Sequence, residues 1–138
     1  MLRIVSGKRR QRRGSIAVEF ALIAPILIFM VIGMIVYGGW FWLAHSVQSL
    51  AYESARASLG GLDATERRQL ALDFVTSRST EMGVPIATNA VAVQSDAQVV
   101  TVTIGYDISG HPLMVLRNLT VPPPQMIERK AVVRLGGY

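Results

Sequence analysis

The 138-residue chain is too short for two full domains, and its fourteen basic and nine acidic residues give a formal net charge of +5. It contains no cysteine, which excludes disulfides, a thiol nucleophile and a zinc–thiolate site. Six of the basic residues precede Gly14. The remaining eight are outnumbered by the nine acidic residues, so the rest of the chain has a formal net charge of −1. A basic tail can bind nucleic acid, but this one has no aromatic side chain to stack on a base. We therefore expect no nucleic-acid partner.

Residues 1–14 form a basic leader, and a long apolar segment follows it. The leader carries Arg3, Lys8, Arg9, Arg10, Arg12 and Arg13. From Phe20 to Ala44 the chain has no formal charge, and as a helix these 25 residues measure about 37 Å, against about 30 Å for a bilayer's hydrocarbon core. A cleavable secretory signal has an apolar core of only about 7 to 15 residues. We predict a transmembrane helix over residues 15–44, with the lipid bilayer as its partner, and a head over residues 45–138.

The residues that flank the apolar segment predict its orientation. Basic residues mark the cytoplasmic side of a membrane helix, and tryptophan and tyrosine concentrate at membrane interfaces. The leader supplies the basic residues, and the far end of the segment has an aromatic group at Tyr37, Trp40, Phe41 and Trp42. We expect the amino terminus in the cytoplasm and the head on the opposite side.

Glu19 lies at the start of the apolar segment, and the residues alone leave two explanations for it. A carboxylate at a helix amino terminus is stabilised by the helix dipole and can remain in reach of water. Alternatively, an intramembrane carboxylate is placed to pair with a cation from another helix. Further along, Pro25 removes an amide hydrogen, which predicts a helix break that neighbouring groups can compensate in a membrane.

The spacing Gly14-x-x-x-x-Glu19-Phe20 before a long apolar helix resembles the processing site of type IV prepilins in its tight-adherence (Flp) form. The residues Glu-Phe-Ala-Leu-Ile-Ala-Pro at 19–25 and Ala-Tyr-Glu-Ser-Ala-Arg at 51–56 are similar to the TadE-like family of minor pilins and pseudopilins. The resemblance implies that a prepilin peptidase cuts between Gly14 and Ser15. It also implies that Glu19, with Phe20 beside it, contacts other subunits during assembly.

What the resemblance implies is a structural subunit for assembly of a tight-adherence pilus. Such a subunit sits in the inner membrane with a periplasmic, pilin-like head, and its partners are the peptidase, other pilin subunits and the assembly platform. We expect no enzyme and no cofactor, because His45 and His111 lack neighbouring acidic residues for a metal site and no catalytic constellation is recognisable. The alternative is an anchored periplasmic adaptor or binding domain that is never cut.

The first helix is expected to continue beyond the membrane and to be followed by a second. A stripe with helical spacing precedes the Gly60-Gly61 stop: Leu43, Val47, Leu50, Ala51, Ser54 and Ser58. A capping-box variant at residues 63–66 starts the second helix, which Gly83 and Pro85 end. Its expected buried face is Leu70, Ala71, Phe74, Val75 and Met82.

The last part of the chain alternates with period two, which is typical of strands. Val91 and Val93 begin a short strand, a turn follows at residues 94–97, and residues 100–108 form the next strand with Val100, Val102, Ile104, Tyr106 and Ile108 on one face. Residues 127–135 form a third, with Ala131, Val133 and Leu135 inward. The predicted class is α+β, with a three-stranded antiparallel sheet covered by helix on one face.

A long connection separates the last two predicted strands. Residues 111–116 are mostly apolar and are expected to dock on the sheet or to touch the membrane or a partner. The prolines at 122–124 predict an extended, stiff stretch that serves as a spacer rather than as a recognition ligand.

Overall fold

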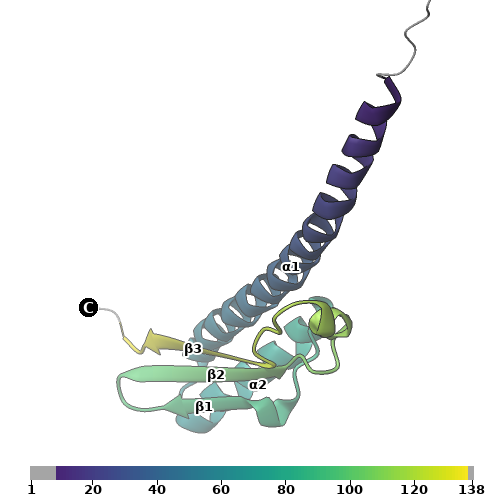
Figure 1. The fold of residues 1–138 in the computed structure, drawn as a ribbon. Helices are drawn as coiled ribbons and strands as arrows, with labels where there is room; N and C mark the ends of the chain where they lie inside the picture. Colours follow the sequence, from purple (N-terminus) through teal and green to yellow (C-terminus); the bar gives the residue numbers. More distant parts are fainter. Residues whose placement is uncertain (1–8, 137–138) are drawn as a thin grey trace, which may run out of the picture.

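The computed structural model describes residues 9–136, and their side chains from residue 14, so the first eight residues of the predicted leader lie outside the described residues. A long helix, α1 (Arg9–Ala57), extends from a small head that contains a second helix, α2 (Ala64–Glu81), and a sheet (Figure 1). Short 3₁₀ turns, η1 (Ser58–Gly60) and η2 (Thr88–Ala90), and a longer one, η3 (Pro112–Leu119), join these elements. The predicted α+β class is confirmed.

Helix α1 has two halves with different surroundings. From Ile16 to Ile35 nearly all of its large apolar side chains are exposed, whereas Val36 and, from Leu43 onward, one face of the helix are buried against the head. Contacts with the head thus begin before residue 45, where the sequence placed the boundary, because residues 112–124 fold back along α1. The helix also runs through Pro25 without interruption, so the predicted break amounts to the loss of one hydrogen bond.

The second half of α1, together with the first residue of η1, buries the stripe that the sequence predicted. Its members are each no more than 1 % exposed: Leu43, Val47, Leu50, Ala51, Ser54 and Ser58. The buried hydroxyl of Ser54 donates to the carbonyl of Ala51 (3.0 Å), and that of Ser58 donates to the carbonyl of Ala55 (2.7 Å). These local bonds satisfy the hydroxyls, so small side chains can let α2 approach closely without leaving polar atoms unpaired.

Side-chain caps define where α2 begins, and a glycine defines where it ends. Asp63 accepts from the backbone nitrogen of Glu66 (2.8 Å), and the Glu66 carboxylate accepts in turn from the backbone nitrogen of Leu62 (2.7 Å). This is the predicted capping box, with its return bond shifted by one residue. At the other end Gly83 has φ +67°, which favours glycine, and the Val84 nitrogen donates to the carbonyl of Ser79 (3.0 Å).

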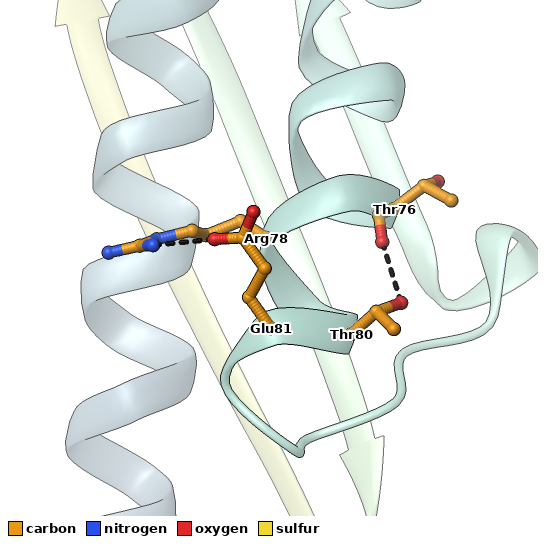
Figure 2. Close-up of polar contacts among 4 residues, drawn as sticks. All are labelled: Thr76, Arg78, Thr80 and Glu81. Carbon is orange, nitrogen blue, oxygen red and sulfur yellow. Dashed lines mark hydrogen bonds and ion pairs between the residues drawn. The ribbon is translucent and has the colours of Figure 1, made fainter.

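The buried face of α2 is narrower than predicted. Ala71, Val75 and Ser79 are buried, whereas Leu70, Phe74 and Met82 are only partly covered, because the helix covers one side of the head and packs on α1 along one stripe. Exposed polar side chains lie around this stripe: Arg78 and Glu81 form an ion pair of 2.7 Å, and the Thr80 hydroxyl donates to the carbonyl of Thr76 (3.0 Å; Figure 2). The bond to Glu81 raises the pKa of Arg78, but both groups are exposed and the pair contributes little to stability.

The sheet consists of β1 (Val91–Ser95), β2 (Val99–Asp107) and β3 (Met126–Arg134) in that order, with β2 central and both pairings antiparallel. The β1–β2 turn is tighter than predicted and starts at Asp96, because this carboxylate accepts from the backbone nitrogens of Gln98 (2.8 Å) and Val99 (2.7 Å). Those two hydrogen bonds stabilise the ionised form and lower the pKa of Asp96.

One face of the sheet forms the core with α1 and α2. Val100, Val102 and Ile104 of β2 are fully buried, as are Ile108 just beyond it and, almost fully, Ile127 of β3. Side chains at alternate positions point the other way, where Val132 remains 52 % exposed. The head therefore has one buried and one solvated sheet face, as the alternation indicated.

Val102→Ala tests the core, and Val132→Ala is its matched control on the open face of the neighbouring strand. Loss of the buried methyl groups is expected to lower the free energy of unfolding by about 2 kcal/mol, from ~0.8 kcal/mol per methylene plus a cavity term. The control is expected to change it by less than about 0.5 kcal/mol. Thermal unfolding of the full chain in detergent, followed by near-ultraviolet circular dichroism, measures both, and equal losses would contradict this account of the core.

Candidate processing and assembly site

The junction at Gly14 and Ser15 lies within α1. Both residues are exposed, and a side chain added at Gly14 would meet nothing within 4 Å. Their peptide bond is therefore accessible but helical. Glycine is about 1 kcal/mol less favourable in a helix than alanine, so the helix unwinds more easily there than elsewhere in its first turns.

Glu19 and Phe20 lie on the exposed half of α1. Phe20 is 70 % exposed, and Glu19 is exposed on the same stretch of helix. Among the residues whose side chains are described, the one ion pair joins Arg78 to Glu81 on α2, so no described cation neutralises Glu19. The structure thus brings Glu19 into contact with neither the head nor any of its charges.

The surrounding surface of α1 is continuously apolar. Phe20, Leu22, Ile26 and Ile35 are more than half exposed, and so is Leu27. Helix α1 is long and apolar enough to cross a membrane. A water-soluble protein rarely leaves so large an apolar surface uncovered, so lipid or other helices are the surroundings that fit it.

Two of the four aromatic residues expected at the membrane interface also hold the head on α1. The Tyr37 hydroxyl donates to the carbonyl of Val121 (3.1 Å), and the Trp40 indole nitrogen donates to the carbonyl of Pro124 (2.9 Å). Phe41 and Trp42 remain exposed. The proline-rich stretch is thus packed rather than a free spacer.

Sequence reasoning missed the docking at Tyr37 and Trp40, although the residues beside them offered a signal. A side chain at Gly39 would lie 2.5 Å from a methyl group of Leu113, whereas one at Gly38 would meet nothing within 4 Å. A Cβ atom at position 39 would require the Leu113 side chain to shift, so the glycine lets this side chain lie close to the helix. A glycine pair in an otherwise bulky helix is therefore a sign that another segment packs there.

The open face of the sheet has a shallow hollow of about 590 Å³ beside Tyr106, Asp107 and Glu128. At its edge the Asp107 carboxylate accepts from the backbone nitrogen of Ser109 (2.8 Å), which lowers the pKa of Asp107. Burial, with a contribution from Asp107, raises the pKa of the Tyr106 hydroxyl.

The two histidines are placed apart. His45 is exposed on α1, while Nδ1 of His111 accepts from the backbone nitrogen of Leu113 (3.2 Å) and caps η3. Within the described part of the chain no three histidine, aspartate or glutamate residues gather as metal ligands would. The arrangement of His111 is that of a capping residue.

Comparison with known protein families matches residues 14–56 to the model of the TadE-like protein family. The match covers the junction at Gly14, Glu19, Pro25 and most of the buried stripe of α1, and it ends before α2. The resemblance seen in the sequence is confirmed over this range. Neither the curated proteins nor the solved structures gave a match.

Gly39→Val, compared with Gly38→Val, tests the docking of η3 on α1. Both changes carry the same helix-propensity cost, but only the side chain at position 39 would push Leu113 away. Trypsin cleavage after Arg117 in η3, measured on the full chain in detergent, is expected to become several-fold faster in Gly39→Val and to stay unchanged in Gly38→Val. Equal cleavage rates would show that the close approach at Gly39 does not hold the segment.

Proposed function

We propose that this chain, which is TadE-like over residues 14–56, is a minor pilin or pseudopilin that helps to assemble a tight-adherence pilus. The observation that carries the proposal is the division of α1, which exposes apolar side chains from Ile16 to Ile35 and buries its stripe from Val36 onward. The exposed half of such a helix crosses the membrane first and packs with similar helices after assembly. The head stays folded on the buried half of α1.

The proposed location is the inner membrane, with the amino terminus in the cytoplasm and the head in the periplasm. The six basic residues before Gly14 support this orientation through the positive-inside rule. The partners are then a prepilin peptidase, other pilin subunits and the assembly platform.

Removal of residues 1–14 by a prepilin peptidase would convert the precursor into the mature subunit. The spacing of Gly14 to Glu19 and the family match over that spacing support the cut between Gly14 and Ser15. A peptidase binds an extended backbone, so the first turns of α1 must open before cleavage. The absence of a side chain at Gly14 favours both the opening and the close approach of the enzyme.

Glu19 would then pair with the new amino terminus of a neighbouring subunit. In the low dielectric of a membrane or a helix bundle, opposite charges attract much more strongly than in water. An uncompensated charge there is costly, so the pair would fix the register between helices. The exposure of Glu19, with no described cation beside it, supports this role.

The helical conformation of the Gly14–Ser15 bond favours a second candidate, an anchored adaptor or binding domain that is never cut. The two candidates differ in the amino terminus of the protein in the membrane. A chain that starts at Ser15 supports the pilin, and a chain that retains residues 1–14 supports the adaptor.

Gly14→Leu is expected to block processing, because a bulky side chain would obstruct the approach of the peptidase at the scissile position. Gly38→Leu is the matched control, since position 38 lies in the same helix and also has open space around it. Intact mass and amino-terminal sequencing of membrane-purified protein measure the outcome. Normal removal of the leader from Gly14→Leu would overturn the assigned cleavage site.

Glu19→Gln and Glu19→Ala are expected to leave processing intact and to reduce surface pili roughly tenfold or more, since breaking one partner of a buried pair costs about 3–5 kcal/mol. Glu19→Asp keeps the charge and is expected to retain part of the assembly. Pili are counted by electron microscopy alongside an immunoblot of the mature subunit. Wild-type pilus numbers in Glu19→Gln would remove the charge-pairing role.

A further inference from the structure

The connection between β2 and β3 exposes large apolar side chains on the side that does not face α1. η3 is attached through Met114, which is only 6 % exposed, while Val115 is 78 % exposed, Leu119 48 % and Val121 73 %. These three exposed residues belong neither to the core of the head nor to the partly buried apolar residues packed against it. An amphipathic segment of this kind fits a boundary between water and an apolar phase.

The position of the β2–β3 connection along α1 shows how it lies relative to the membrane-crossing part of the helix. The Thr120 hydroxyl oxygen lies 3.9 Å from the place where Gly33 would carry a Cβ atom. The Val121 carbonyl accepts a hydrogen bond from the Tyr37 hydroxyl. Figure 1 shows the yellow-green connection lying against α1 where the exposed half of the helix meets the head. Residues 120 and 121 are thus placed beside the stretch of α1 from Gly33 to Tyr37.

The thickness of a bilayer places that stretch at the membrane surface. A hydrocarbon core of about 30 Å takes up roughly 20 helical residues at ~1.5 Å each. If the core begins at Gly14, directly after the last leader arginine, α1 leaves it near Gly33. If it begins at Phe20, after Glu19, α1 leaves it near Gly39. A tilted helix needs more residues to cross, which moves the exit still further along α1.

The charge of the connection suits a lipid surface. Between Asp107 and Glu128 its one formally charged residue is Arg117, which is exposed. An arginine can keep its aliphatic stem in apolar surroundings and extend its guanidinium to lipid phosphates. No carboxylate belongs to this stretch, so nothing in it opposes contact with an anionic surface.

We propose that residues 115–121 lie in the interfacial layer of the leaflet on the head's side of the membrane. Val115, Leu119 and Val121 contact the outer ends of the acyl chains, and Arg117 reaches the phosphates. The head then has a second lipid contact besides α1, which fixes its orientation on the membrane. This inference rests on the part of the proposed function in which α1 crosses the membrane, and it holds whether or not the chain is processed.

Depth-dependent fluorescence quenching tests the proposal, and the absence of cysteine makes single labelling straightforward. An environment-sensitive fluorophore is attached to Val121→Cys and Leu119→Cys in the full chain, in phosphatidylcholine–phosphatidylglycerol vesicles at a low protein-to-lipid ratio. Leu27→Cys is the control for a membrane-embedded site, and Val132→Cys, on the open face of β3, is the control for water. Near-ultraviolet circular dichroism checks the fold of each labelled chain, and Val115→Cys serves as a further position.

Nitroxide-labelled lipids are expected to quench the labels at positions 119 and 121 nearly as strongly as the label at 27. Aqueous iodide is expected to quench them several-fold less than the label at 132. Labels that behave like position 132 would overturn the proposal. So would labels that stay shielded from both quenchers however far the protein is diluted in lipid, because that result indicates contact with protein rather than with lipid. A label at 27 that lipid nitroxides do not quench would instead overturn the membrane crossing, and this inference with it.

Discussion

The packing of one face of α1 against the sheet and α2 is the contact on which the rest of the structure depends. Without disulfides the head is held by apolar burial, and α1 supplies a buried stripe that runs from Leu43 to Ser54 and continues to Ser58 of η1. Small residues such as Ala51 and Ser54 make the stripe flat enough for close approach, and β2 contributes a matching row of buried β-branched side chains. One helix thus provides a wall of the core and also the apolar surface outside it.

This shared use of α1 explains why the head and the helix have no linker between them. The hydrogen bonds of Tyr37 and Trp40 to the β2–β3 connection extend the contact toward the exposed half of the helix. Gly39 lets the Leu113 side chain of the connection lie against the helix at this point.

The elements of the head could be predicted from the sequence because their signals are local. The helical stripe of α1, the cap at Asp63 and the alternation along β2 each follow from a few neighbouring residues. The docking of Trp40 on Pro124 could not be predicted, because a backbone carbonyl 84 positions away leaves no pattern in the sequence. The start of the β1–β2 turn was misplaced because Asp96 supplies its own hydrogen-bond acceptor, which sets the turn more tightly than composition indicates.

The candidate site was predicted in a different way. The spacing of Gly14 and Glu19 identified it, and the family match covers the same residues. The local structure adds that Gly14 is helical and that Glu19 lacks a described cation beside it. Sequence reasoning left two explanations for this carboxylate because its proposed partner belongs to another molecule, whereas core residues carry their partners in the same chain.

The continuity of α1 from the junction into the core has a geometric consequence. Each residue of a helix turns the chain by about 100°, so the direction in which Glu19 points is fixed relative to the head by the number of residues between them. Pro25 does not interrupt α1, so no loop between Glu19 and the head could compensate for a rotation about the helix axis. Inserting or deleting one residue between Glu19 and the head would therefore rotate the carboxylate around the helix axis by about 100° while leaving its chemistry unchanged.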